Sequence, residues 1–217
     1  EPPFQFAHVR LHGREATVTG HSLRVPVSSL VDVHCHTEYA YCATSVKVEK
    51  NIELSSDLGL AGLGLVEHTF QLYFDSKFAW SYEWQEDRLL VEKLWRQGRG
   101  RMPAYREFIS RWKSPFVYLG LEVDMIDGGS LLLADEDAEG WDYLIGTIHD
   151  ISGFTAGVTL QADAERMFMR DMERLVVNPI QVVAHPFRFF TRCAHPCPAH
   201  LYDAVADMLA EHGIAAE

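Results

Sequence analysis

Residue types that bind metal ions stand together at the end of an apolar run early in this 217-residue chain. The run over 28–33 passes through Asp32 and ends in His34-Cys35-His36. If it is a strand, alternate residues face the same side, so Asp32, His34 and His36 project together. Two imidazoles one residue apart are a common way to hold a divalent transition metal. The spacing predicts a metal site, and a pair of structural surface histidines is the alternative.

Several later apolar runs also end in a histidine or a glutamate. These residues are Glu67 and His68 after 60–66, Glu122 after 115–121, His149 after 141–148 and His185 after 180–184. Each has an ordinary alternative: a satisfied buried histidine for His149 or His185, and a salt-bridge or helix-capping carboxylate for Glu122. The carboxyl ends of parallel strands meet at one mouth, where the active sites of α/β barrels lie. Together the residues therefore predict a single metal centre.

The elements that must position these residues alternate between strand and helix. Apolar runs of strand length recur at least five times, and amphipathic helices fit 45–58, 162–177 and 198–212. This rhythm predicts an α/β fold with a parallel sheet, either a barrel or an open doubly wound sheet. Residues 1–27 fit a β extension, residues 28–217 the main domain, and residues 70–113 an aromatic and helical insertion. We expect the acidic run 135–139 to be a solvated surface.

Composition excludes several classes of protein. With 47% hydrophobic residues the chain can bury one large core, and its net charge of −12 argues against broad attraction to nucleic acid or an anionic membrane. Because the sequence contains no 18-residue apolar run and no charged-then-apolar leader, we expect neither a membrane span nor a signal peptide. Four cysteines favour a reducing, cytoplasmic setting over a disulfide scaffold. A zinc knuckle is disfavoured by the loose spacing of its candidate ligands, Cys193, His195, Cys197 and His200.

The order of the motifs resembles the PHP (polymerase and histidinol phosphatase) superfamily. The matching motifs are Asp-x-His-x-His from Asp32, Glu67-His68, Gly-x-Glu-x-Asp at 120–124, Ile-Gly-Thr-x-His ending at His149, and Ala-His-Pro at 184–186. Within the superfamily, segments 120–124 and 142–149 are most similar to the histidinol-phosphatase branch. The resemblance implies a distorted TIM-like (β/α)7 barrel that hydrolyses phosphoesters with two to three divalent ions of zinc, iron or manganese.

The resemblance also implies ligand roles. His34, His36 and Glu122 would hold one metal, Glu122 would bridge to a second metal, and His68 would belong to a third. The residues implied as metal ligands are His34, His36, Glu67, His68, Glu122, His149 and His185, and those implied as catalytic are His34, His36, Glu122, His149 and His185. Cys42 stands where the family has a further ligand. The family's last motif, Gly-Ser-Asp-x-His, is not matched, so we expect a barrel truncated at the carboxyl end by about two strands.

The expected chemistry is attack on phosphorus by a metal-bridged hydroxide, which needs no serine or cysteine nucleophile. Arg188, Arg192 and Lys77 are candidates to bind the phosphate, since arginine can do so bidentately; a surface role is the alternative for each. The leading hypothesis is a phosphomonoesterase acting on a small-molecule phosphate ester similar to histidinol phosphate. The alternatives are a phosphodiesterase or nuclease and a non-catalytic metal-binding remnant. Neither a membrane nor a long polynucleotide is expected as a partner.

Overall fold

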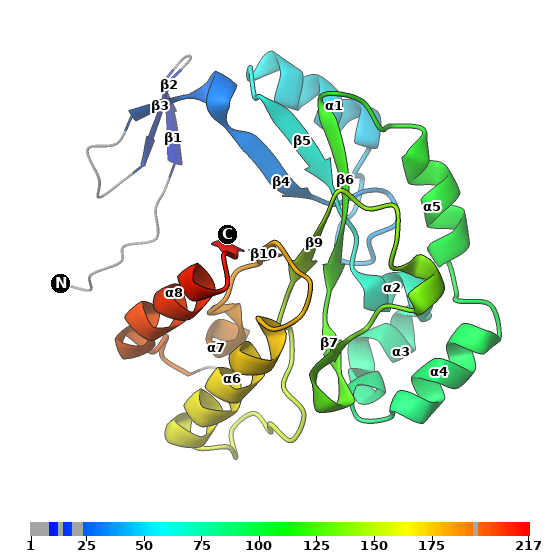
Figure 1. Cartoon of the computed structure of the whole chain (residues 1–217), viewed down its shortest axis with the longest axis vertical. Helices are drawn as coiled ribbons and strands as arrows, with labels where there is room; N and C mark the ends of the chain where they lie inside the picture. The colour runs from blue at the N-terminus through cyan, green and yellow to red at the C-terminus, as the bar shows by residue number, and fades with distance from the viewer. Residues whose placement is uncertain (1–8, 13–14, 19–23, 193–194) are drawn as a thin grey trace.

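A curled sheet of six parallel strands forms the centre of the protein (Figure 1). The computed structural model describes residues 9–12, 15–18, 24–192 and 195–217. The strand order is β11-β10-β9-β6-β5-β4, and every neighbouring pair is parallel. The strands are β4 (Val31–Cys35), β5 (Gly62–Leu65), β6 (Val117–Val123), β9 (Tyr143–Gly146), β10 (Val182–Val183) and β11 (Ala215–Ala216). This open half-barrel confirms the predicted α/β, TIM-like architecture.

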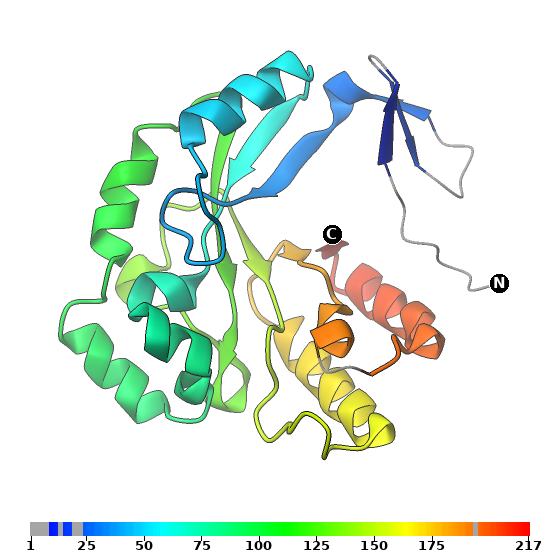
Figure 2. The same cartoon turned by 180° about the vertical axis from the view of Figure 1, so that it is seen from behind.

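Helices connect most of the consecutive strands and cover the outer side of the sheet (Figures 1 and 2), whereas a hairpin and two short 3-10 helices lead from β6 to β9. The connecting helices include α1 (Val48–Asp57), α6 (Gln161–Leu175), α7 (Arg188–Arg192) and α8 (Tyr202–Glu211), the last preceded by the short 3-10 helix η5 (Ala199–Leu201). In α6 the buried residues Ala164, Phe168, Met172 and Leu175 recur at helical spacing. Helix α1 starts later than predicted because Ser45 has a positive φ of 61°, which a helical residue cannot adopt.

The predicted insertion forms a helical layer between β5 and β6. It contains α2 (Thr69–Tyr73), α3 (Ser76–Ser81), η2 (Glu83–Gln85), α4 (Arg88–Arg96) and α5 (Met102–Ser110). Phe70 and Trp84 are fully buried and stack with ring centroids 5.6 Å apart, so aromatic residues provide packing for this layer. Gly100 lies against the backbone carbonyls of Leu72 and Tyr73, and this close approach leaves no space for a Cβ atom.

A small antiparallel sheet precedes the barrel strands. It consists of β1 (Val9–His12), β2 (Glu15–Val18) and β3 (Arg24–Pro26), paired in that order, and the 3-10 helix η1 (Val27–Ser29) leads into β4. The domain boundary between residues 27 and 28 stays a prediction. A second hairpin, β7 (Met125–Ile126) with β8 (Ser130–Leu131) around η3 (Asp127–Gly129), follows β6. In the described part of the chain, no helix has the length and apolar character needed to cross a membrane.

The prediction of a fully solvated acidic run over 135–139 was wrong at one residue. Asp137, in the 3-10 helix η4 (Asp135–Asp137), has no exposed surface. Its carboxylate pairs with Arg99 at 2.7 Å and accepts a hydrogen bond from the Tyr73 hydroxyl at 3.1 Å. A buried carboxylate is tolerated where a cation and hydrogen-bond donors compensate it. Because Arg99 is distant in sequence, the acidic composition of the run does not reveal the pair.

Candidate metal centre

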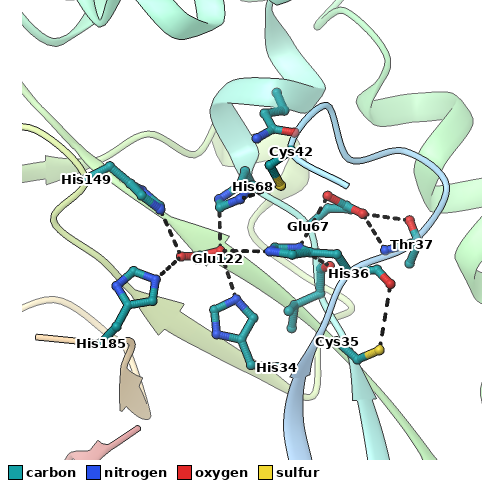
Figure 3. A network of polar contacts seen from close by, with 12 residues as sticks. His34, Cys35, His36, Thr37, Cys42, Glu67, His68, Glu122, His149 and His185 are labelled. Carbon is teal, nitrogen blue, oxygen red and sulfur yellow. Dashed lines mark hydrogen bonds and ion pairs between the residues drawn. The ribbon is translucent and has the colours of Figure 1, made fainter. Parts of the chain in front are cut away.

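Five imidazole rings converge on the carboxylate of Glu122 at the mouth of the curled sheet (Figure 3). Glu122 has no exposed surface. Its Oε2 lies 2.8 Å from Nδ1 of His68, 2.9 Å from Nε2 of His34 and 3.7 Å from Nε2 of His36. Its Oε1 lies 3.3 Å from Nε2 of His149 and 3.2 Å from Nε2 of His185. The histidines thus form two groups, one at each carboxylate oxygen.

The parallel sheet brings these residues together from segments far apart in sequence. His34 belongs to β4, Glu122 belongs to β6, and the other four imidazoles follow directly or closely after β4, β5, β9 and β10. A parallel bridge between His68 and Glu122 extends the pairing of β5 with β6 beyond the strand end. His185 has a positive φ of 32°, a strained conformation for a residue other than glycine. The fold therefore places all the predicted histidines at one position.

Most of these rings are oriented by a second contact on the nitrogen that faces away from Glu122. Nδ1 of His149 lies 3.0 Å from both carboxylate oxygens of the buried Asp124, and Nδ1 of His36 lies 3.3 Å from the Val66 carbonyl oxygen. Nδ1 of His34 lies 2.5 Å from Oε2 of Glu217. When the ring donates its Nδ1 proton to such an acceptor, the lone pair of Nε2 is directed inward, as in metal sites.

Asp124 was not predicted as a functional residue. Its signal in the sequence is its position two residues after Glu122, because residues i and i+2 of a strand face the same side. Strand β6 therefore supplies the central carboxylate, and the residue directly after it supplies the carboxylate that orients His149.

Mutual contacts change the protonation of the central groups in the metal-free protein. Burial disfavours the charged form of Glu122, but His68 and His149 more than offset it and hold the pKa of Glu122 well below its usual value. Burial would lower the pKa of His34, yet Glu122 and Glu217 raise it to about 10. Against the same burial effect, Asp124 and Glu122 raise the pKa of His149 to about 9. Bound cations would therefore have to displace protons from these rings.

Several buried atoms of the centre have no hydrogen-bond partner among the described residues. They are Oε2 of Glu67, Oε1 of Glu122, Nδ1 of His68 and Nδ1 of His185. Nδ1 of His68 lies close to Glu122 without hydrogen-bond geometry. Buried polar atoms are normally satisfied, and a carboxylate surrounded by imidazoles is a donor set that divalent transition metals prefer. The residues present therefore fit the metal ions that the sequence predicts.

Possible ligand atoms form three groups, each within 4.8 Å. The groups are His34 with His36 and Glu122, His68 with Glu122 and His149, and His36 with Cys42 and His68. His185 approaches the second group through its contact with Glu122. The assignment of individual ligands stays a prediction.

Glu67, also predicted as a metal ligand, divides its two oxygens between different tasks. Its Oε1 accepts hydrogen bonds from the backbone N–H of Thr37 at 2.6 Å and from the Thr37 hydroxyl at 2.8 Å. Its Oε2 lies 3.6 Å from Nδ1 of His36. Glu67 thus holds the loop after His36 in place, and Oε2 alone is left for a cation.

Two of the three predicted phosphate-binding residues are exposed at the surface. Arg188 is exposed at the start of α7, three residues after His185, and Lys77 is exposed on α3. The Arg192 side chain lies outside the described residues. Binding of phosphate by these residues stays a prediction.

The candidate residues of the zinc knuckle have separate partners. Cys197 hydrogen-bonds with the Tyr202 hydroxyl at 3.0 Å, His200 contacts Glu165 at 3.1 Å and His195 contacts the Thr159 carbonyl at 3.1 Å. Cys193 lies outside the described residues.

Comparison with known proteins identifies the family. The family model of the PHP domain matches residues 32–217, a range that begins at Asp32 and contains all seven predicted metal ligands. A comparison with curated proteins gave no match. PHP domains are metal-binding domains of phosphoester hydrolases, and the cluster around Glu122 supplies the donor atoms that such a domain requires. The match covers most of the chain, and the protein therefore belongs to the PHP domain family.

Proposed function

We propose that the protein is a metal-dependent phosphoesterase that hydrolyses a phosphomonoester of a small molecule, similar to histidinol phosphate. The observation that carries the proposal is the convergence of five imidazoles on the buried carboxylate of Glu122. Clusters of this composition hold two to three divalent ions of zinc, iron or manganese. A cation-rich pocket would also explain how a protein with a net charge of −12 attracts an anionic substrate.

Each part of the centre has a distinct task in this proposal. His34 and His36 would bind a cation at the Oε2 side of Glu122, and His149 and His185 would bind a second at the Oε1 side. When bound, the ions would acidify a water and neutralise phosphate oxygens. Asp124 keeps Nε2 of His149 directed at the centre through its contact with Nδ1.

Small phosphomonoesters are preferred over polynucleotides as substrates. The net charge of −12 opposes the approach of a long anionic chain, whose binding depends on many lysine and arginine contacts. Arg188 and Arg192 on α7, with Lys77 on α3, are proposed to bind a single phosphate group. The free thiols of Cys35, Cys42 and Cys197 support a reducing, cytoplasmic setting.

The test is release of phosphate by protein reconstituted with zinc, iron(II) or manganese. Substrates would include histidinol phosphate, 4-nitrophenyl phosphate, bis(4-nitrophenyl) phosphate and a single-stranded oligonucleotide. We expect turnover of the monoesters. The rate of phosphate release should fall by at least ~100-fold in His185→Ala, because even the replacement of a residue that only supports a metal ligand lowers activity or metal affinity by 10–100-fold. The exposed His212 provides the matched control His212→Ala. Turnover of the diesters alone would favour the phosphodiesterase alternative. Metal binding without turnover of any substrate would favour the alternative of a non-catalytic metal-binding remnant.

A further inference from the structure

An exposed tryptophan lies close to the imidazole cluster. Trp80, on α3, is 41% exposed, and its ring packs against the fully buried ring of Phe70 with centroids 5.6 Å apart. The Phe70 ring in turn lies 5.0 Å from the ring of His68 and 5.6 Å from the ring of His149. Both imidazoles contact the carboxylate of Glu122. Trp80 therefore presents an accessible aromatic ring two ring contacts away from the candidate metal ligands.

Helix α3 directs the Trp80 side chain toward the metal centre. Successive residues of a helix are rotated by about 100°, so Phe78 and Trp80 project to nearly opposite sides of α3. The Phe78 ring packs against Phe74 at 5.0 Å, whereas the Trp80 ring packs against Phe70. Helix α3 lies beside α2, the helix that carries Phe70 (Figure 1). The two short helices therefore set the direction of the indole toward the imidazoles.

Other aromatic rings already fill the space around Phe70. The rings of Trp84 and Tyr82 pack against it with centroids 5.6 Å and 5.7 Å away, and both residues are buried. Among the tryptophans of the described residues, only Trp80 is exposed. A single exposed apolar side chain is ordinary on a protein surface, but aromatic rings beside a reactive centre commonly bind the organic part of a ligand. The position of Trp80, rather than its exposure alone, therefore indicates a binding role.

We propose that Trp80 binds the organic part of the substrate, so that the protein prefers phosphomonoesters that carry a planar ring. This inference rests on the proposed function and specifies its substrate class. The phosphate group would lie at the metal centre around Glu122, and the ring would stack on the open face of the indole. Aromatic rings favour offset-stacked contacts of this kind, and an indole face also attracts a cationic ring. Trp80 is thus a specificity-determining residue that does not touch the reacting phosphorus.

The test compares two substrates of the metal-loaded protein that share a phosphate and an amino group. Histidinol phosphate carries an imidazole ring, and 2-aminoethyl phosphate carries no ring. In Trp80→Ala we expect KM for histidinol phosphate to rise about 10-fold with kcat nearly unchanged, because the lost contact is the same in the bound substrate and in the transition state. KM for 2-aminoethyl phosphate should stay the same. Trp80→Phe, which keeps an aromatic ring, should restore most of the affinity for histidinol phosphate.

A second readout does not depend on turnover. L-Histidinol, the alcohol that remains after loss of the phosphate, should change the tryptophan fluorescence of the metal-loaded protein saturably, and this change should be absent in Trp80→Phe. Tyr118→Ala is the matched control, because Tyr118 is 40% exposed at the amino end of β6, opposite the end that carries Glu122. This variant should keep both the fluorescence change and the kinetics of the unmodified protein.

Unchanged or equally raised KM values for the two substrates in Trp80→Ala would overturn this inference alone. A histidinol signal that survives in Trp80→Phe would also overturn it. If the folded, metal-loaded protein hydrolyses no phosphomonoester, the proposed function is overturned, and the fluorescence titration still decides whether Trp80 binds a ring. Circular dichroism separates these outcomes from misfolding.

Discussion

Replacement of Glu122 by glutamine should abolish tight metal binding and leave the fold intact. Glutamine has nearly the same shape as glutamate, so the packing around this buried position changes little. The substitution removes the negative charge and replaces one acceptor oxygen with an NH₂ group. That group cannot bind a cation, so only one of the two groups of histidines keeps a shared oxygen.

The size of the effect follows from the distances at this residue. Four ring nitrogens lie 2.8–3.3 Å from the carboxylate oxygens, so an ion bound to them lies within about 4 Å of the carboxylate charge. Loss of one unit charge at ~4 Å costs about 4 kcal/mol at an effective dielectric constant of ~20. This free energy corresponds to a loss of roughly 10³-fold in affinity for each ion. The calculation is conservative because it counts each ion as a single unit charge.

The assay is isothermal titration of metal-free protein with zinc, together with elemental analysis after gel filtration. The exposed Glu136 provides a matched control, since Glu136→Gln removes the same charge from the surface. We expect micromolar or weaker binding in Glu122→Gln and no change in Glu136→Gln. Unchanged affinity and ion number in Glu122→Gln would refute the role of Glu122 as the bridging ligand.

Three further predictions concern the surroundings of this residue. Asp124→Asn should weaken metal binding about 10- to 100-fold without unfolding the protein, because the substitution loosens the orientation of His149. Titration of the metal-free variant with zinc measures this loss of affinity. The raised pKa values of His34 (about 10) and His149 (about 9) stabilise the metal-free protein fully below pH ~6.5, the unperturbed pKa of histidine. Calorimetry should therefore show a melting temperature of the metal-free protein that falls as the pH rises through 9 to 10; a flat profile would contradict these contacts. Gly64→Ala should lower the free energy of unfolding by about 1–3 kcal/mol, because its Cβ would collide with the Tyr143 hydroxyl. Denaturant titration measures this loss, which Tyr143→Phe should partly restore.

The sequence was sufficient to predict which residues meet, because parallel strands share one functional edge. His34, Glu122 and His149 are far apart in the chain, yet each stands at the carboxyl end of an apolar run. Once the runs are identified as parallel strands, their ends must lie together. The same logic indicates the position of His185, although its strand β10 has only two residues.

Contacts made by side chains across the fold were less predictable. The pairing of buried Asp137 with Arg99 joins two segments whose composition suggests only a polar surface. The division of the Glu67 oxygens between Thr37 and the metal centre depends on the path of one loop. The Asp137 pair depends on the packing of the helical insertion, whose first part, residues 71–84, has no clear periodicity in the sequence. The apolar pattern of the sequence predicts where the strands end, whereas side-chain packing determines which contacts hold the functional residues in place.

The measurement that tests the central claim most directly is anomalous X-ray scattering at the zinc edge from crystals grown with zinc. The account predicts two peaks that flank the carboxylate of Glu122, each about 2.0–2.2 Å from histidine nitrogens. One peak should lie near Nε2 of His34 on the Oε2 side, and the other near Nε2 of His149 and His185 on the Oε1 side. A map in which zinc is absent from this position, or bound only by surface residues, would contradict the account.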